Sequence, residues 1–321
     1  MRRMRPRRER HPVHGVLLLD KPVGMSSNTA LQKARWLLGA AKAGHTGTLD
    51  PLASGVLPLC LGAATKFGQR TLDADKAYQA ELLLGQTTTT GDREGDVLRT
   101  RPVAVQPDEV DRVRASFLGA ITQIPPMYSA LKKEGKPLYQ YAREGVEVDR
   151  APRQVHIYAL DLTFQSGEPL GEAGAVGNFP TLSMFVRCSK GTYVRTLAED
   201  IGEALGCGAH LRSLRRVQAG GYDVAQCITL DALEATPAAE RGACLLPVDT
   251  LLTGLPVILL DADEADRFLH GLPRSGPWPD AVLVAVYSLA RVLLGTGSVV
   301  DGRLLPQRLL NLEELGPYST L

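Results

Sequence analysis

The amino-acid sequence predicts an α+β fold built around a mixed, largely antiparallel sheet. Strand-like apolar runs recur along the chain with only a few helical patterns between them, which is typical of this class. The last ~70 residues, a length typical of a small domain, alternate apolar runs with glycine-containing turns at 281–287, 291–294 and 299–303. We therefore expect one large unit, a boundary near residue 250, and a small β-rich module after it.

Strand signals recur through the large unit. Residues 78–84 alternate well enough for a strand, which Gly85 closes. Residues 56–61 form a continuous apolar run between Gly55 and Gly62, typical of a short buried segment. The other predicted strands cover residues 13–19, 155–162, 182–188 and 210–217.

Helical signals are fewer. In residues 192–205 apolar side chains recur at i, i+4 and i+8 from Leu197, which marks one buried face. Ser27 or Asn28 is the candidate N-cap of an earlier helix that runs to about residue 38. A further helix is predicted at 107–118, a polar loop at 87–95, and a mobile hairpin end at the glycine-rich stretch 167–177.

Composition fits an ordinary globular protein rather than a membrane or disulfide-rich one. The 321 residues are 44% hydrophobic and 22% charged. No apolar run is long enough to span a bilayer, and no signal-peptide pattern is visible. The five cysteines are scattered without a CxxC pair, which argues against a zinc site and a disulfide framework. We expect a cytoplasmic protein.

The charge of the chain is concentrated at its start. The formal net charge is +1, but residues 1–10 hold six arginines and one glutamate, a local charge of +5 that leaves the remainder at −4. We expect a disordered tail over residues 1–11. It either adds non-specific attraction to phosphates or is a tolerated extension, and its sequence favours neither.

A stiff loop around Asp50 is the most distinctive stretch of the sequence. Pro51 biases Asp50 toward extended backbone, while Gly44 and Gly47 allow sharp turning before it. The loop presents one carboxylate against the buried segment that follows, and catalytic groups are often held this way. An isolated Asp-Pro is more often a surface turn, so the loop alone does not decide between these interpretations.

Residues 123–153 mix basic and aromatic side chains. Such a mixture suits an arm that grips a phosphate backbone and stacks on bases. It also suits a solvated loop and short helix whose tyrosines pack inward, and composition favours neither. The side chains concerned are Lys132, Lys133, Lys136, Tyr139, Tyr141, Arg143, Arg150 and Arg153. A second basic group, Arg212, Arg215 and Arg216, is also available for phosphates.

Four segments together resemble the TruB family of pseudouridine synthases, in the order in which that family carries them. They are residues 20–27, 44–58, 75–80 and 188–197, and the resemblance extends from Asp20 to about Arg216. It implies the pseudouridine synthase fold. It also implies the reaction, in which the T-loop uridine of tRNA, position 55, is flipped out and its C1′–N1 bond is exchanged for a C1′–C5 bond.

The resemblance assigns the chemistry to a few side chains. Asp50 stands at the catalytic position, as nucleophile or as base, and Arg195 stands at the position of its partner. Tyr78 matches the tyrosine that stacks on the flipped base.

Other positions match the substrate site of the family. Tyr193 and Leu214 match base-pocket positions, and His45 matches the residue that fills the space left by the flipped base. Lys21, with Pro22, matches a motif that supports the site. Residues 123–153 match the insertion that clamps the tRNA arm, with Lys132, Lys133 and Arg143 among its cations.

The resemblance also implies domains and partners. We expect a catalytic domain at 12–250 and a PUA-like RNA-binding domain at 251–321. The isomerisation needs no redox step or group donor, so no cofactor is expected. No metal is expected either, because the cysteines and histidines are scattered and the Asp50 loop offers a single carboxylate. The expected partner is the T arm of tRNA, bound by a monomer that requires no protein partner and contacts no membrane.

Three alternatives compete with this interpretation. A different Asp-nucleophile enzyme, such as a hydrolase, finds no support, because the sequence has no GxSxG, HExxH, P-loop or GxGxxG motif. A non-catalytic tRNA-folding chaperone would not need the catalytic positions. A relative that depends on guide RNA is disfavoured by the basic arm.

Overall fold

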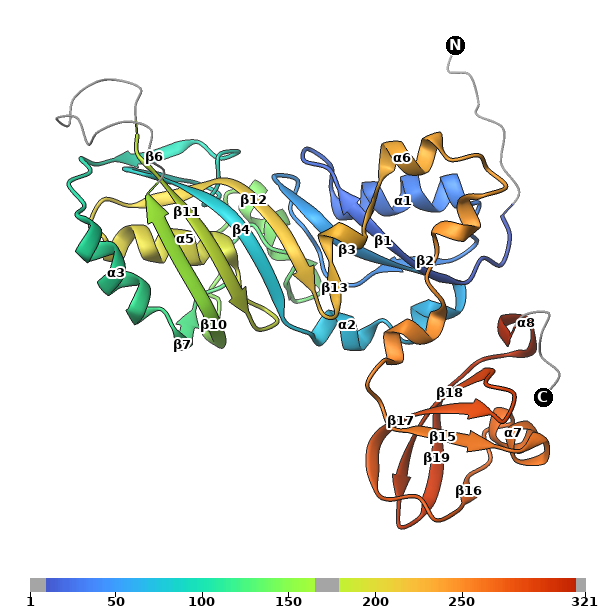
Figure 1. Cartoon of the computed structure of the whole chain (residues 1–321). Coiled ribbons are helices and arrows are strands. Elements are labelled where there is room, and N and C mark those ends of the chain that lie inside the picture. The colour runs from blue at the N-terminus through green and yellow to red at the C-terminus, as the bar shows by residue number, and fades with distance from the viewer. Residues whose placement is uncertain (1–9, 165–178, 316–321) are drawn as a thin grey trace.

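The computed structural model describes residues 10–164 and 179–315. The glycine-rich stretch at 167–177 and most of the predicted Arg-rich tail lie outside the described residues. Two larger sheets organise the described chain, one of ten strands and one of five (Figure 1). Two short hairpins accompany them.

The ten-stranded sheet is mixed and largely antiparallel, as predicted. Its order is β14-β1-β3-β12-β4-β11-β10-β7, with β13 beside β12 and β2 beside β3. Only two of its pairings are parallel, β1 with β14 and β3 with β12. The strands are β1 (Gly15–Lys21), β2 (Ala43–His45), β3 (Ala53–Leu61), β4 (Lys76–Leu84), β7 (Gly119–Gln123), β10 (Arg153–Phe164), β11 (Thr181–Cys188), β12 (Ala209–Ala219), β13 (Tyr222–Asp223) and β14 (Ile228–Thr229).

Helices lie along one face of this sheet and around its ends (Figure 1). The helix predicted at 192–205 forms α5, and the helix predicted at 107–118 ends early, at Ser116. The α-helices are α1 (Ser27–Leu38), α2 (Gln69–Asp73), α3 (Pro107–Ser116), α4 (Leu138–Arg143), α5 (Val194–Ala204), α6 (Leu230–Ala235), α7 (Ala262–Leu269) and α8 (Leu312–Leu315).

The N-cap of α1 differs from the prediction. Ser26 is the cap, because its side chain accepts the backbone N–H of Thr29 at 3.1 Å. Ser27 is buried instead, and its hydroxyl accepts from Leu49 N at 2.7 Å and donates to Leu49 O at 2.9 Å. One serine therefore starts the helix, and the next ties it to the residue before Asp50.

Two hairpins lie in regions where the sequence predicts no strand. The polar loop predicted at 87–95 is the turn of a hairpin, β5 (Gln86–Thr88) with β6 (Val97–Thr100). Within residues 123–153, β8 (Lys132–Lys133) pairs with β9 (Lys136–Pro137) ahead of α4. These four strands are too short for an alternation of side chains to reveal them in the sequence.

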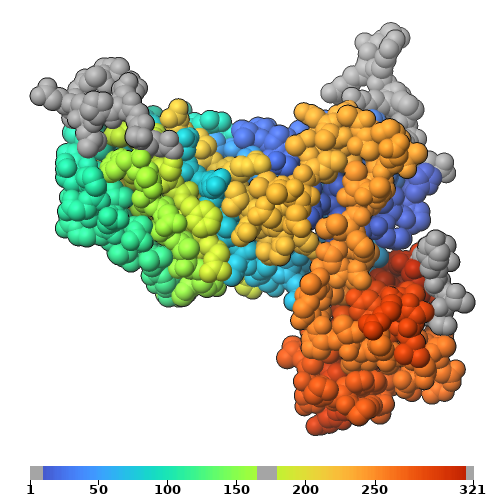
Figure 2. Space-filling model, viewed as in Figure 1, coloured from blue at the N-terminus to red at the C-terminus, as the bar shows by residue number. Residues whose placement is uncertain are grey.

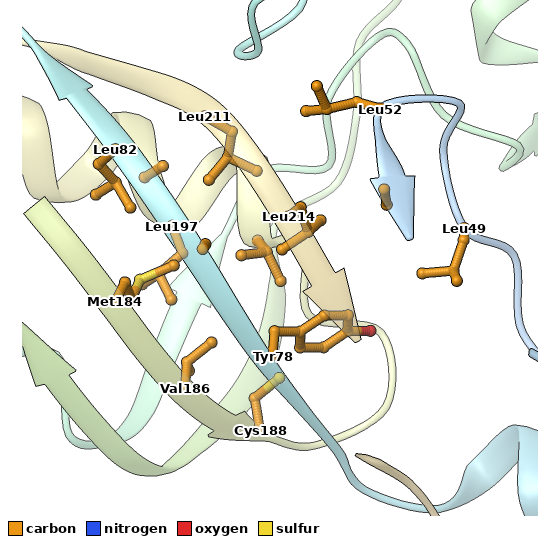
Figure 3. Packing of buried hydrophobic residues seen from close by; sticks show 14 of the residues in the cluster. Leu49, Leu52, Tyr78, Leu82, Met184, Val186, Cys188, Leu197, Leu211 and Leu214 are labelled. Atoms are coloured by element: carbon orange, nitrogen blue, oxygen red, sulfur yellow. The ribbon is translucent and has the colours of Figure 1, made fainter. Parts of the chain in front are cut away.

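A leucine-rich core joins the helices to the large sheet. Leu82, Met184, Val186 and Leu211 point from the strands toward Leu197 of α5 (Figure 3). All five are at most 2% exposed. Full burial of such a side chain contributes about 1.5–3 kcal/mol, so this layer fixes α5 firmly on the sheet.

The five-stranded sheet forms a C-terminal module with its own small core, and α7 packs against it. Its order is β15-β17-β18-β19-β16. The prediction of two short runs around glycine turns at 291–303 was wrong, because β18 continues through both glycines, Gly295 and Gly297. The strands are β15 (Val257–Leu260), β16 (Arg274–Ser275), β17 (Ala281–Ser288), β18 (Leu293–Val300) and β19 (Arg303–Leu309).

Glycine is required in β18 because its neighbour lies unusually close. A Cβ at Gly295 would lie 2.1 Å from the carbonyl oxygen of Arg308 in β19, and Gly295 has φ +152°. A pattern of apolar runs and glycines cannot distinguish a turn from this close approach of two strands.

A third hydrophobic cluster joins the two sheets. The predicted boundary near residue 250 falls in the 3-10 helix Val248–Leu252, and Leu251 and Leu252 pack with Val16 of the large sheet and Ala285 of the small one. The C-terminal module projects from one end of the larger body, orange to red in Figure 2. The two sheets are therefore connected by packed side chains as well as by the chain itself.

Candidate active site

The loop that carries Asp50 connects β2 to β3 and is held from both sides. Ser27 bonds the backbone of Leu49, and Gly24 N donates to Pro51 O at 2.7 Å. Gly47 has φ +100°, as the sequence suggested, but Gly44 lies in β2 and needs no such conformation. The backbone on either side of Asp50 is thus fixed before any substrate binds.

Arg195 and Asp50, far apart in the sequence, meet in an ion pair. Arg195 Nη2 lies 2.9 Å from Asp50 Oδ2. The Arg195 side chain is only 5% exposed, whereas that of Asp50 is 41% exposed. The arginine is therefore part of the protein interior, and the carboxylate is open to a ligand.

Arg195 is held by more than Asp50. It donates to Thr90 O at 2.9 Å and to Tyr128 O at 2.6 Å. A second carboxylate, Asp92, lies 3.8 Å from its Nε and is 5% exposed. These contacts fix the direction of the guanidinium, because each side of its planar fork faces an acceptor.

Asp92 is the functional-site residue that sequence reasoning missed. It accepts hydrogen bonds from Thr90 Oγ1 at 2.6 Å and from Glu94 N at 3.0 Å. The sequence interpretation treated this stretch as a polar loop, and no motif distinguished Asp92 from its polar neighbours. What the sequence offered was a carboxylate within a stretch of threonines and glycines, a pattern that surface turns also show.

Opposing electrostatic effects act on Asp50. Burial raises the pKa of Asp50 above its ordinary value, because protein surrounds the carboxylate although its tip is open; Arg195 opposes this, and Asp92 adds to it. Burial also lowers the pKa of Lys21 to about 8, while Asp50 and Glu94 act in the other direction. The site thus holds an acid and a base whose pKa values have moved toward neutrality.

Tyr78 and Leu214 come from the neighbouring strands β4 and β12. Leu214 pairs with Ala80 in the register and, like Tyr78, is under 10% exposed (Figure 3). Burial raises the pKa of Tyr78, with Arg216 opposing. The phenol therefore stays protonated at neutral pH.

Arg216 has a different place from the one the sequence suggested. It is 1% exposed, and it donates to Val56 O at 2.7 Å and to Gly47 O at 3.2 Å. Its side chain thus ties both flanks of the Asp50 loop to β12, and it is not available for phosphates. Arg215 is partly exposed and pairs with Asp20 at 2.7 Å.

His45 and Tyr193 come from distant parts of the sequence, the first near Asp50 and the second near Arg195. His45, in β2, is half-buried, and its Nδ1 has no hydrogen-bond partner within the described chain. Burial, with a contribution from Arg216, lowers the pKa of His45. Tyr193 directly precedes α5, two residues before Arg195.

Lys21 is fully buried and turned toward backbone. Its Nζ donates to Pro22 O at 2.8 Å and to Met25 O at 2.6 Å. These bonds shape the turn between β1 and α1, beside the Asp50 loop. In this structure Lys21 holds that turn and presents no surface to a ligand.

The segment 123–153, here called the arm, carries its cations on the surface. Lys132, Lys133 and Arg143 are exposed, and Lys133 donates to the backbone of Asp149 at 3.0 Å. Arg143 lies over the ring of Tyr139, with Cζ 5.4 Å from the centroid. Because Tyr128 belongs to the arm, its carbonyl links the arm to Arg195.

No metal site forms among residues 10–164 and 179–315: nowhere do three or more His, Cys, Asp or Glu side chains come together in a way that could hold an ion. None of the helices in the same residues has the length and apolar character needed to cross a membrane. The five cysteines all carry free thiols.

An open carboxylate held by a buried arginine lies on a mixed sheet that also carries a buried tyrosine. Solved structures show which fold this is. The solved structure described as a Cbf5-Nop10-Gar1 complex superposes with a TM-score of 0.67 at 26% identity, over 95% of this chain and 88% of that chain. The class is therefore that of the pseudouridine synthase fold.

Sequence comparison gives the family. The model of the TruB family pseudouridylate synthase N-terminal domain matches residues 35–194, that of the tRNA pseudouridylate synthase B C-terminal domain matches 195–253, and that of the TruB C-terminal region of pseudouridine synthase II matches 256–310. The chain belongs to the TruB family of pseudouridylate synthases.

Curated relatives resemble the chain along nearly its whole length. The tRNA pseudouridine synthase B of Verminephrobacter eiseniae is 55% identical over 315 residues, which cover 97% of this chain and 93% of the relative. That of Ralstonia pickettii is 53% identical over 320 residues, 96% of each chain.

Proposed function

We propose that this enzyme converts the uridine at position 55, in the T loop of tRNA, into pseudouridine. The observation that carries the proposal is the Asp50–Arg195 pair, whose carboxylate is open while its guanidinium is buried. The relatives at 53–55% identity, named tRNA pseudouridine synthase B, support tRNA as the substrate.

The chemistry follows from one carboxylate. Asp50 either attacks C1′ of the ribose as a nucleophile or removes a proton from the sugar, and both routes need it ionised. The C1′–N1 bond breaks, a C1′–C5 bond forms, the proton on C5 leaves to a base, and N1 gains a proton. Arg195 keeps the carboxylate ionised and aimed.

The base must leave its loop before it can react. Extrusion costs a few kcal/mol of unstacking, and an aromatic platform returns about 1–3 kcal/mol per stacked base. Tyr78 is the proposed platform, with Tyr193 and Leu214 around the base. His45 then fills the space that the base leaves.

The remaining surfaces are proposed to hold the RNA. The arm, with Lys132, Lys133 and Arg143, clamps the T arm as an insertion in a catalytic domain at 12–250. Residues 251–321 form a PUA-like RNA-binding domain. Lys21 supports the loop of Asp50.

The reaction is proposed to need no cofactor, since it exchanges one glycosidic bond for another without a redox step or a group donor. We expect a monomer that acts in the cytoplasm without a protein partner or a metal ion in the chemical step. Any effect of Mg²⁺ then acts through tRNA folding.

The test is tritium release from tRNA transcript labelled at C5 of uridine, with the purified chain alone. We expect release from the T-loop uridine and none from a transcript that lacks it. A chaperone releases none, and a guide-dependent enzyme releases none without its guide RNA. A T-arm stem-loop that folds without Mg²⁺ should react equally fast in excess EDTA, and a rate that collapses there, with binding intact, would reveal a catalytic metal.

A further inference from the structure

The two ends of the arm meet at Tyr193. Gln123 is the last residue of β7 and Arg153 the first of β10, and the two are partners in the strand register. The Gln123 side chain accepts from Tyr193 N at 3.0 Å and donates to Tyr193 O at 3.2 Å. The backbone of Tyr193 is therefore fixed by the residue from which the arm departs.

Arg153, to which the arm returns, covers the ring of the same tyrosine. Its Cζ lies 4.4 Å from the centroid of the Tyr193 ring, a distance at which a guanidinium is attracted to an aromatic face. Arg153 thus holds the ring of Tyr193, and Gln123 holds its backbone. Both residues lie where the arm joins the sheet.

The guanidinium of Arg153 has unused hydrogen-bonding capacity. Its Nε is buried without a hydrogen-bond partner, and no carboxylate within the described chain lies within ion-pair distance of it. Arg150, three residues earlier, also has a buried Nε without a partner, but its Nη1 donates to Pro125 O at 3.3 Å and its Nη2 pairs with Glu147 at 3.4 Å. A half-buried cation without an anion, beside an aromatic ring, matches a ligand that brings its own negative charge.

We propose that Arg153 is a substrate-positioning residue that binds a backbone phosphate of the RNA next to the extruded uridine while it holds the Tyr193 ring. Flipping a nucleotide turns its flanking phosphates, so a cation beside the base pocket meets one of them. A guanidinium can stack on a ring through its face and bind a phosphate through its edge, whereas an ammonium cannot do both. This inference rests on the proposed function, because it requires RNA in the site.

The experiment compares Arg153→Met and Arg153→Lys with wild type on the T-arm stem-loop. The dependence of affinity on salt and the single-turnover rate are measured for each. Arg187→Met is the matched control: Arg187 also lies over a tyrosine ring, with Cζ 5.1 Å from the centroid of Tyr158. Its strand neighbours, Val186 and Cys188, are buried. Because successive side chains of a strand alternate, Arg187 lies on the face of the sheet opposite to theirs.

We expect Arg153→Met to flatten the slope of log K against log salt by about 0.7 to 0.9, the value of one phosphate contact. The rate should fall about 3- to 30-fold, the range for loss of one cation–π interaction. Arg153→Lys should keep the slope and lose part of the rate, and the control should change neither. Combined with Tyr193→Leu, Arg153→Met should have less than its single effect on the rate, because both act through one ring.

An unchanged slope in Arg153→Met would overturn the phosphate contact, and rate effects that add fully with Tyr193→Leu would overturn the action through Tyr193. If Arg153→Met lowers the melting temperature, its rate also reflects lost stability. The rate of Arg153→Lys then tests the positioning role, and Arg153→Lys combined with Tyr193→Leu tests the coupling. Wild-type protein that neither binds nor isomerises the stem-loop would refute the proposed function instead.

Discussion

At the scale of single residues, the site divides its two charges between the surface and the interior. Arg195 is buried and has four acceptors around it, two of them backbone carbonyls, so its position does not depend on Asp50 alone. Asp50 is the member of the pair that a substrate can reach. A fixed cation behind an accessible carboxylate is a preorganised arrangement, because the cation is already in place when a ligand reaches the carboxylate.

Asp50→Asn should abolish isomerisation and leave RNA affinity within a few-fold of wild type. The amide keeps the size and polarity of the side chain but is neither a nucleophile nor a base. Tritium release measures the first effect, and filter binding of the stem-loop measures the second. Turnover near the wild-type rate would remove Asp50 from the chemistry.

Asp92→Asn should slow the single-turnover rate about 10- to 100-fold, which corresponds to the loss of one interaction with a charged group. Its negative charge contributes to the raised pKa of Asp50. Removing that charge lowers this pKa, so the acidic limb of the rate profile should move to lower pH. Rates measured between about pH 5 and 8 test both effects.

The matched control for Asp92 is Asp96→Asn in the same hairpin. Asp96 is exposed and lies outside the Arg195 network. It should leave the rate and the pH profile unchanged. An acidic limb that stays in place in Asp92→Asn would mean that Asp92 does not act on Asp50.

At the scale of elements, the site depends on where strands and loops cross. Gly55, in β3, has φ +105°, and a Cβ there would lie 2.1 Å from the carbonyl oxygen of Arg216 in β12. The parallel strands β3 and β12 can therefore approach this closely only because position 55 is glycine. Arg216 in turn bonds both flanks of the Asp50 loop, so the crossing sets the position of the carboxylate.

Gly55→Ala should lower the melting temperature strongly and reduce activity with it, because the backbone conformation and the close strand both exclude a Cβ. Gly44→Ala is the control from the same motif: a Cβ at Gly44 would have no neighbouring atom within 4 Å, and its φ is not positive. Differential scanning calorimetry compares the two. Equal melting temperatures for both variants would show that the strand crossing tolerates a side chain.

The arm should act through charge that is spread over its surface. Replacing Lys132, Lys133 and Arg143 by glutamine should flatten the slope of log K against log salt by about 0.7 to 0.9 for each phosphate that the variant no longer binds. Lys33→Gln, on α1 and paired with Glu234, should leave the slope unchanged. If the triple variant keeps the wild-type slope, the RNA lies elsewhere, for example along Arg212 and the C-terminal module.

At the scale of the whole molecule, the two sheets share one hydrophobic cluster. Leu252 is 4% exposed and lies between them, together with Val16 of β1 and Ala285 of β17. An ion pair adds to this connection, since Lys66 Nζ lies 2.5 Å from Glu314 Oε2. The C-terminal module therefore has a packed junction with the body, and we expect the two to unfold together.

Leu252→Ala should destabilise the protein by about 2–5 kcal/mol, as large-to-small changes in a core do. Because both sheets contribute to the cluster, a single calorimetric transition should move as a whole. Leu289→Ala is the control, since Leu289 is 65% exposed and its truncation removes little buried surface. Two separate transitions, of which only one moves, would show that the module folds independently.

The sequence by itself determined the local elements and the candidates. Periodicity located β4, β11 and α5 to within a few residues, because side-chain alternation and helical spacing are properties of a short stretch of chain. It also placed Asp50 on a stiff loop beside a buried strand. The family resemblance, rather than any pattern, supplied Arg195 as its partner.

Only the tertiary structure decided which of these candidates meet. Asp92 reaches Arg195 because the turn of the β5–β6 hairpin lies against α5. Arg216 is buried because β12 lies between β3 and β4. Gly295 is a strand residue rather than a turn because β19 lies against it. These outcomes depend on the order of strands in the sheet. That order is set by contacts between segments distant in the sequence, which local propensity does not encode.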